Sequence, residues 1–324
     1  MITRRALLGG IGAAALIRQA RAATQVTLAI SSNTLAYGGL RIAEGAGLFP
    51  KNGLEPRIIV MDSGNAAISA VLGGSADFAS SGPGEVLAAK VRGRDLVIVQ
   101  NFYRGLPGSL VLSKAAAAKS GVAPDAPVEQ KLRVLDKLAI AEPSATSAYL
   151  HPYRAASEAV GAKIKFVYMT QPAMVAALQA GAVDGIVAGA PFSLVAVSNG
   201  SGVLWISGPK DELPEPVRPT SSACLQTTAE YAKAHPDIIA AMRRVGADLA
   251  DFIQNKPVEA LVIMAKAYPS LDAASAKDAF AENAKNWSMP KMTPQDIKRE
   301  IDIQVSSGAL PGVDKIDPAS VLWP

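Results

Sequence analysis

The chain carries an internal repeat, which emerges when the sequence is compared with itself at an offset of 107 residues. Residues 58–84 read IIVMDSGNAAISAVLGGSADFASSGPG, and residues 165–191 read KFVYMTQPAMVAALQAGAVDGIVAGAP. Six of the 27 aligned positions are identical without a gap, and the local signals follow in the same order. Each copy predicts a short apolar strand, a polar turn, an apolar helix, a Gly-x-x-Asp turn and a second strand. The chain therefore contains one β-α-β unit twice.

A further strand and helix precede each copy of the repeat. The strand at 26–30 leads to a helix at about 40–53, and the strand at 138–141 leads to a helix at about 149–161. Short strands that are apolar on both faces and alternate with helices are typical of parallel sheets covered on both sides. We therefore expect an α/β protein with two lobes, each a three-layer α/β/α sandwich.

Two more strands complete each half, and only helices follow them. The strands are predicted at 96–100 and 110–113 in the first half, and at 203–207 and 223–227 in the second. The helices of the C-terminal tail are predicted at 230–235, 238–254, 258–267, 273–283 and 294–307, with prolines near their starts and ends. This tail is expected to pack on the first lobe.

The predicted elements divide the chain into a leader and two lobes. Lobe I is assigned residues 23–103 together with about 216–324, which include the C-terminal helices. Lobe II is assigned residues from about 104 to 215. The chain would cross between the lobes near 104–108 and again in the proline-rich stretch 213–220.

The first 22 residues are typical of an export signal and are set aside. Thr3-Arg4-Arg5 precedes an apolar stretch at 6–17, and Ala20-Arg21-Ala22 fits a signal peptidase site. The stretch is shorter than the roughly 20 apolar residues that span a bilayer. It resembles a twin-arginine signal, with a Sec signal as the alternative, and predicts a periplasmic protein cleaved near Ala22.

Removing this leader changes the charge of the chain. It holds four arginines, so 32 minus 4 leaves 28 basic residues against 28 acidic ones. The mature protein is nearly neutral, and nothing in it suggests a nucleic-acid track. Cys224 is the single cysteine, so disulfides cannot support the fold and a core must do so.

Several segments resemble one family of proteins. They are AEGAGLFPKNGLEPRII (43–59), AISAVLGGSADFASSGPGEVLAA (67–89), MVAALQAGAVDGIVAGAP (174–191) and AEYAKAHPDIIAAMRRVGAD (229–248). Together they resemble the periplasmic substrate-binding proteins of nitrate-, sulfonate- and taurine-type ABC transporters, including relatives that bind thiamine-pyrimidine precursors. One departure is EQKLRVLDKLAI (129–140), which lacks the glycine usual at the entry to the second lobe.

The resemblance implies a fold and a function. The fold is the two-lobed, type II-like periplasmic binding protein fold with a helical C-terminal tail. The function is that of the extracytoplasmic solute-binding component of an ABC importer, which captures a small polar or anionic organic molecule between the lobes. A sulfonate, nitrate, an aromatic carboxylate and a pyrimidine are all compatible. The expected partners are this ligand and the inner-membrane permease, with the protein monomeric and without a cofactor or metal.

Ligand contacts are expected in the turns that follow the strands. In open α/β sheets ligands bind at the carboxyl ends of strands, where helix N-termini present free N–H groups to polar or anionic groups. Hydroxyls, amides and glycines dominate these turns, although the same residues also serve as helix caps. The predicted ligand-binding residues are Ser32, Asn33, Thr34, Tyr37, Ser63, Gly64, Asn65, Ser81, Gly82, Pro83, Ser144, Thr146, Ser147, Thr170, Gln171, Gly189 and Pro191. Asp77 and Asp184 are interpreted as structural turn residues.

A few larger side chains near these turns are secondary candidates. A flat ligand would stack on one or two aromatic rings. The rings beside the turns belong to Tyr37, Phe102, Tyr103, Tyr149 and Phe192, and core packing is the alternative for Phe102 and Phe192. Arg41, Arg104 and Arg154 are candidates for bidentate contacts to an anion, with solvated ion pairs as the alternative.

Two other functions have the same architecture. One is a pyrimidine-synthase-like enzyme of thiamine biosynthesis, and the other is a ligand-sensing domain of a regulator. His151 and His235, the two histidines in the sequence, both precede a proline at a predicted helix start, and no nucleophile triad, metal motif or phosphate-binding loop is present in the sequence. We therefore expect a binding protein rather than an enzyme.

Overall fold

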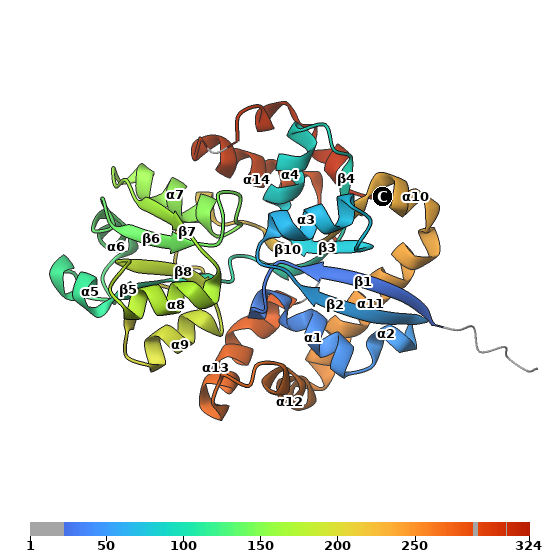
Figure 1. Ribbon diagram of the computed structural model, residues 1–324, viewed down its shortest axis with the longest axis horizontal. Coiled ribbons are helices and arrows are strands. Elements are labelled where there is room, and N and C mark those ends of the chain that lie inside the picture. The colour runs from blue at the N-terminus through green and yellow to red at the C-terminus, as the bar shows by residue number, and fades with distance from the viewer. Residues whose placement is uncertain (1–22, 288–290, 309) are drawn as a thin grey trace, which may run out of the picture.

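The computed structural model describes residues 23–324 apart from 288–290 and 309, so the predicted leader lies outside the described residues. Two lobes lie side by side, each built on a five-stranded sheet (Figure 1). Lobe I contains β1 (Thr24–Ile30), α1 (Gly38–Gly45), α2 (Leu48–Lys51), β2 (Leu54–Val60), α3 (Gly64–Leu72), β3 (Phe78–Ser81), α4 (Pro83–Val91), β4 (Leu96–Arg104) and β10 (Ser221–Thr228). Lobe II contains β5 (Gly108–Ser113), α5 (Lys114–Ser120), α6 (Val128–Arg133), β6 (Ala139–Glu142), α7 (Leu150–Ala159), β7 (Lys165–Tyr168), α8 (Gln171–Gln179), β8 (Gly185–Gly189), α9 (Phe192–Ser198) and β9 (Gly202–Ile206).

The remaining elements form the C-terminal tail, with short 3-10 turns at several junctions. The tail helices are α10 (Ala229–Ala234), α11 (Pro236–Asn255), α12 (Pro257–Ala267), α13 (Ala273–Asn283) and α14 (Pro294–Ser306). The 3-10 turns are η1 (Leu35–Tyr37), η2 (Glu215–Val217), η3 (Ala284–Trp287), η4 (Val313–Lys315) and η5 (Pro318–Val321). All five predicted tail helices are present, within two residues of the predicted ends.

The repeat predicted from the sequence is confirmed. Helix α3 at 64–72 and helix α8 at 171–179 coincide at the 107-residue offset. The Asp77 side chain accepts a hydrogen bond from the Thr27 backbone N–H at 2.7 Å, and Asp184 accepts one from Ala139 at 2.8 Å. Each aspartate therefore joins its turn to the neighbouring parallel strand, the structural role that the sequence indicated.

The sheets expected to be parallel are mixed sheets, each with parallel and antiparallel pairs. The strand orders are β2-β1-β3-β10-β4 and β7-β6-β8-β5-β9, and both β10 and β5 run antiparallel to their neighbours. Each of these two strands follows a crossing between the lobes, so it enters its sheet from the opposite end. Strand hydrophobicity carries no information on direction, which is why the sequence did not show this.

One predicted helix is divided. The expected helix at 40–53 is instead α1 and α2, separated at Gly47, whose φ of +69° is a left-handed conformation that glycine adopts readily. The break at this glycine separates the two helices, and α2 leads directly into β2.

The core consists of layers on both faces of each sheet. In β1, Leu28 belongs to a core cluster with residues of α1, α2, α11, α12 and α13, while Ala29 belongs to a second cluster with residues of α3, α4 and α14. In β5 of lobe II, Leu110 packs with α6 and α7, while Val111 packs with α8 and α9. This alternation follows from the two-residue side-chain period of a strand.

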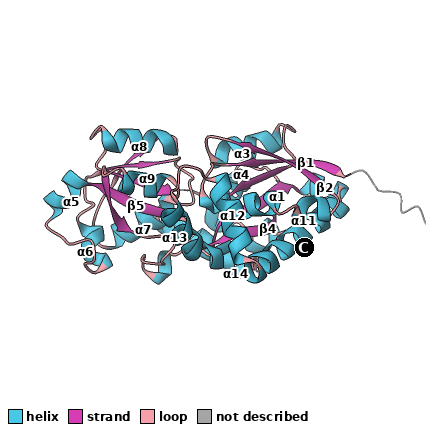
Figure 2. Ribbon diagram, turned by 90° about the horizontal axis from the view of Figure 1, so that it is seen from below, coloured by secondary structure: helices cyan, strands magenta, loops and turns pink. Residues whose placement is uncertain are grey.

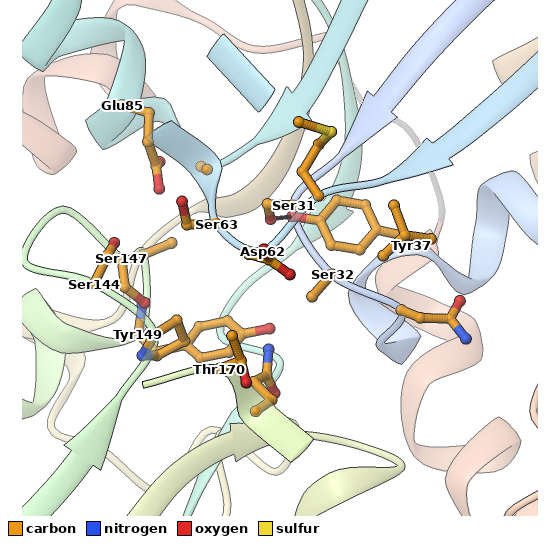
Figure 3. Close-up of a pocket in the computed structure, with 18 of the residues that line it drawn as sticks. Ser31, Ser32, Tyr37, Asp62, Ser63, Glu85, Ser144, Ser147, Tyr149 and Thr170 are labelled. Atoms are coloured by element: carbon orange, nitrogen blue, oxygen red, sulfur yellow. Dashed lines mark hydrogen bonds between the residues drawn. The ribbon is translucent and has the colours of Figure 1, made fainter. Parts of the chain in front are cut away.

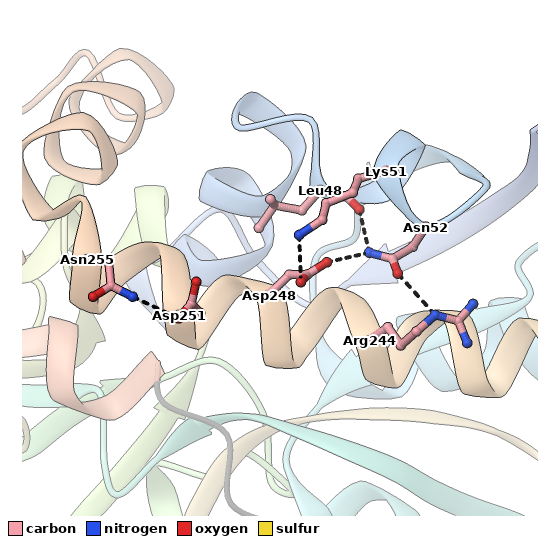
Figure 4. A network of polar contacts seen from close by, with 7 residues as sticks. All are labelled: Leu48, Lys51, Asn52, Arg244, Asp248, Asp251 and Asn255. Carbon is pink, nitrogen blue, oxygen red and sulfur yellow. Dashed lines mark hydrogen bonds and ion pairs between the residues drawn. The ribbon is translucent and has the colours of Figure 1, made fainter.

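The C-terminal tail packs mainly on lobe I. Figure 4 shows Asp248 of α11 accepting hydrogen bonds from Lys51 at 2.8 Å and from Asn52 at 2.7 Å, both in the α2 region. The Asn52 side-chain oxygen in turn accepts a bond from Arg244 at 3.1 Å. Helix α14 differs from the other tail helices because it contacts α4 of lobe I and α7 of lobe II.

Two segments connect the lobes. The chain passes from β4 to β5 through residues 105–107 and from β9 to β10 through residues 207–220. The Gly105 N–H donates to the Thr220 carbonyl at 3.1 Å, so the two connections lie against each other. Paired connections of this kind form a natural hinge.

Candidate functional site

A cavity of about 180 Å³ lies between the lobes and is the candidate site (Figure 3). The turns after β1, β2 and β3 line it from lobe I, and the turns after β6 and β7 line it from lobe II. These are the carboxyl ends of parallel strands, where open α/β sheets bind ligands. A cavity of roughly 150 Å³ holds one benzene molecule, so this cavity suits a small ligand.

Ten of the seventeen predicted ligand-binding residues line this cavity. They are Ser32, Asn33, Tyr37, Ser63, Gly64, Gly82, Ser144, Ser147, Thr170 and Gln171. Their contribution to ligand contact stays a prediction, but the fold brings all of them to one space. Several also cap or brace turns: the Ser63 hydroxyl accepts a bond from the Ala66 N–H, and the Tyr37 hydroxyl is hydrogen-bonded to Ser31.

The other seven predicted residues do not line the cavity. They are Thr34, Asn65, Ser81, Pro83, Thr146, Gly189 and Pro191. Thr34 is wholly buried, and its carbonyl accepts a bond from the Tyr268 hydroxyl at 2.7 Å. The Ser81 hydroxyl donates to Gln226 at 2.9 Å, so it faces β10 instead. Asn65 is exposed on α3, beyond the cavity mouth.

The structure adds lining residues that the sequence analysis missed. They are Val60, Met61, Asp62, Glu85, Pro143, Ala148 and Ser222. Ser31 and Pro172, which belong to the predicted turns, and the secondary candidates Tyr149 and Phe192 also line the cavity. Asp62 directly precedes the predicted Ser63 turn, and Glu85 lies three residues after Gly82. Both residues could have been included in the prediction by considering the positions next to each predicted loop. Glu85 lies in the first turn of a helix, and such a turn faces the same space as the loop before it.

No arginine, lysine or histidine is among the described residues that line the cavity. Arg41 pairs with Glu44 on its own helix, and the Arg154 guanidinium lies 5.2 Å from the centre of the Phe166 ring. Arg104 borders a separate surface depression with Asp211 and Glu215. The three candidate arginines therefore lie outside the cavity.

Glu85 is the most unusual group in the cavity. Glu85 is only 4% exposed, and its Oε2 atom has no hydrogen-bond partner within the protein. Burial raises the pKa of this carboxyl to about 8, with Glu300 adding to the rise and the backbone N–H groups of Glu85 and Gly82 opposing it. An unpartnered buried oxygen costs free energy, so this atom is free to take part in a further hydrogen bond.

The two lobes touch around the cavity. The Leu35 N–H of lobe I donates to the Ala190 carbonyl of lobe II at 2.7 Å. Gly82 of lobe I faces Ala148 of lobe II so closely that an added Cβ would lie 2.6 Å from the Ala148 methyl group. The lobes are therefore in a closed arrangement around the cavity.

The two histidines and the cysteine of the chain lie outside the cavity. His151 is buried beside Ser307 of the tail, and burial lowers its pKa to about 4. His235 stacks near Tyr231 at the start of α11. Burial raises the pKa of the Cys224 thiol to about 12. Within the described part of the chain, no group of three or more His, Cys, Asp or Glu side chains is placed to hold a metal ion.

The sequence matches the NMT1-like family over residues 19–268, most of its length. The chain belongs to this family. The resemblance to nitrate- and sulfonate-type substrate-binding proteins stated from the sequence is thereby confirmed. No curated protein matches the chain.

Solved structures with the same two-lobed fold include three informative ones. A protein from Bordetella bronchiseptica RB50 is 21% identical with a TM-score of 0.72, over 93% of this chain and 94% of that one. The alkanesulfonate-binding protein SsuA from Xanthomonas axonopodis pv. citri, bound to MOPS, is 18% identical with a TM-score of 0.73, over 93% and 98%. The periplasmic nitrate-binding protein NrtA from Synechocystis PCC 6803 is 14% identical with a TM-score of 0.63, over 90% and 86%. These likenesses confirm the fold class.

In the part of the chain that the structure describes, no helix is both long enough and apolar enough to span a bilayer.

Proposed function

We propose that this protein is the extracytoplasmic solute-binding component of an ABC importer, which captures a small polar organic molecule between its lobes and delivers it to a permease. The observation that carries the proposal is the cavity itself. It is closed by contact between two hinged lobes and lined by polar turns from both of them. A ligand that bridges the lobes stabilises the closed state, which a transporter can distinguish from the open one.

The comparisons support a carrier rather than an enzyme. Two of the proteins with this fold are described as binding an alkanesulfonate and nitrate, and the latter as periplasmic. Neither histidine of the chain lines the cavity, and this favours a carrier over the synthase-like alternative. We therefore propose that the protein has no enzymatic activity, acts as a monomer, and is exported to the periplasm with its leader removed near Ala22.

Two experiments test this function. Cell fractionation of the full-length chain should recover a trimmed protein in the periplasm. A thermal-shift screen of sulfonates, nitrate, aromatic carboxylates, pyrimidines and small organic cations should find at least one stabilising compound, because a ligand that binds only the folded state raises its stability. Recovery of full-length protein in the cytoplasm alone would contradict the export proposal, and enzymatic turnover of a bound compound would contradict the carrier proposal.

A further inference from the structure

The turn at the start of α4 holds the Glu85 carboxyl inside the cavity. Figure 3 shows the carboxyl groups of Glu85 and Asp62 directed into the space between the lobes. Both glycines next to Glu85 make room for its carboxyl: an added Cβ at Gly64 would overlap Oε1, and one at Gly82 would lie 3.0 Å from Oε2. The position of this carboxyl is therefore enforced by its surroundings.

This carboxyl occupies the place that an anion would otherwise take. Helix N-termini attract negative groups, and α3 and α4 both begin at the cavity. Glu85 is the third residue of α4 and lies against Gly64, the first residue of α3. The protein's own acidic side chain is thus already placed at these two helix ends, and a bound sulfonate or nitrate would have to share them with it.

The remaining polar atoms of the cavity also favour a donor ligand. Asn33 Oδ1 is a second buried acceptor without a partner in the protein. Asp62 adds a carboxylate at the cavity wall, and the described lining residues supply no cationic side chain. A buried acceptor recovers its desolvation cost when it receives a hydrogen bond, and a charged donor gives the strongest one.

We propose that the ligand carries a cationic N–H donor group, an amine or an amidine, which binds the Glu85 carboxyl with Asp62 nearby. This inference rests on the proposed function and names the ligand class for the same cavity. The aromatic rings of Tyr149 and Phe192 line the lobe II side, and the cavity volume of about 180 Å³ fits a ligand near the size of a substituted benzene.

Three compounds of similar shape and different charge can test whether the cavity prefers a cationic ligand. Benzamidine, benzamide and benzoate present a cation, a neutral amide and an anion on the same ring. Calorimetric titration at about pH 8, where a substantial share of Glu85 is ionised, should show benzamidine binding about tenfold or more tightly than benzoate, with benzamide between them.

Variants test whether the preference for benzamidine depends on Glu85. Glu85→Gln keeps the side-chain volume and should weaken benzamidine about tenfold, while benzamide changes by less than about threefold. Glu300→Gln is the matched control, because Glu300 is also a buried acid but does not line the cavity, and it should keep the wild-type order. Asp62→Asn should reduce benzamidine affinity by a smaller factor than Glu85→Gln. The melting temperature of each free variant verifies folding.

Three results would overturn the inference. They are tighter binding of benzoate or benzenesulfonate than of benzamidine, the same order of affinities in Glu85→Gln as in the wild type, and no binding of benzamidine. Tight binding of an anion with closure of the lobes would overturn the ligand class while upholding the carrier function. The experiments can therefore contradict the proposed ligand class without contradicting the proposed carrier function.

Discussion

The backbone N–H of Leu35 donates to the carbonyl of Ala190 at 2.7 Å, which joins lobe I to lobe II beside the cavity. Leu35 begins the short 3-10 turn after β1, and Ala190 follows β8. The contact depends on the lobes being closed, since the two strands belong to different sheets. Opening of the hinge would break this hydrogen bond and expose the cavity, so the bond marks the closed state.

Gly82 should be required for closure. Gly82→Ala places a methyl group 2.6 Å from the Ala148 methyl group across the lobe boundary, and overpacking of this kind costs about 1–3 kcal/mol. Gly82 has a φ of −72°, so alanine adopts the same backbone conformation in the open state. Affinity for the best ligand of the screen should therefore fall about tenfold or more, as measured by calorimetry.

The double variant Gly82→Ala with Ala148→Gly is the control for this prediction. It removes the opposing methyl group and should restore part of the lost affinity, because the methyl group added at Gly82 still lies 3.0 Å from Glu85 Oε2. Equal affinity of Gly82→Ala and the wild type would show that the lobes do not close to this contact when ligand binds.

The stability of the protein should fall as pH rises from about 7 to about 8. Burial raises the pKa of Glu85 to about 8 and that of Glu300 to about 7, and it also raises that of Glu142. In this window the unfolded chain has already lost these protons while the folded state retains part of them, so unfolding becomes more favourable. One such group contributes a slope of up to about 1.4 kcal/mol per pH unit.

Glu85→Gln should flatten this dependence, as measured by urea unfolding at several pH values. The measurement is restricted to pH above about 6.5 because His151, whose pKa is lowered to about 4, acts in the opposite direction below that value. An identical slope in the variant would mean that Glu85 is already ionised in the folded protein.

Asp77 and Asp184 should have similar effects on stability through their matching strand hydrogen bonds, although the Asp77 carboxyl also interacts with Tyr231. Each accepts a bond from a strand N–H, at 2.7 and 2.8 Å, so Asp77→Ala and Asp184→Ala should each lower the free energy of unfolding by about 1–3 kcal/mol. Asparagine retains an acceptor oxygen and should lower it less at both positions. Urea unfolding measures this, and a large effect at only one of the two sites would contradict their equivalence.

Much of the fold was predictable because the internal repeat is visible in the sequence and marks equivalent elements in the two lobes. The offset of 107 residues placed α3 and α8, the Gly74 and Gly181 turns and the two aspartates at matching positions. Strand direction was not predictable, since neither the apolar β5 nor the more polar β10 carries a local sequence signal for its direction. Their orientation follows from the two lobe crossings, which are long-range features.

The candidate site was only partly predictable for a related reason. Ser63 and Thr170 lie in polar turns at strand ends, and the sequence indicates such turns well. Ser81 has the same chemistry but is directed to Gln226, a residue 145 positions away that no local pattern reveals. In the sequence, Glu85 looks like an acidic residue of the kind common in the first turn of a helix. Only its packing against Gly64 and Gly82 shows that it enters the cavity.

Ligand-driven closure of the two lobes is most directly tested by a distance measured between them. Figure 2 shows α3 of lobe I and α8 of lobe II on the same side of the molecule. Ser69 on α3 and Gln179 on α8 are exposed, so Ser69→Cys with Gln179→Cys can carry spin labels, while the native Cys224 is buried and should stay unlabelled. Double electron–electron resonance should give a broad distribution without ligand and a shorter, narrower one with the best compound of the screen. An unchanged distribution at saturating ligand would contradict capture by lobe closure.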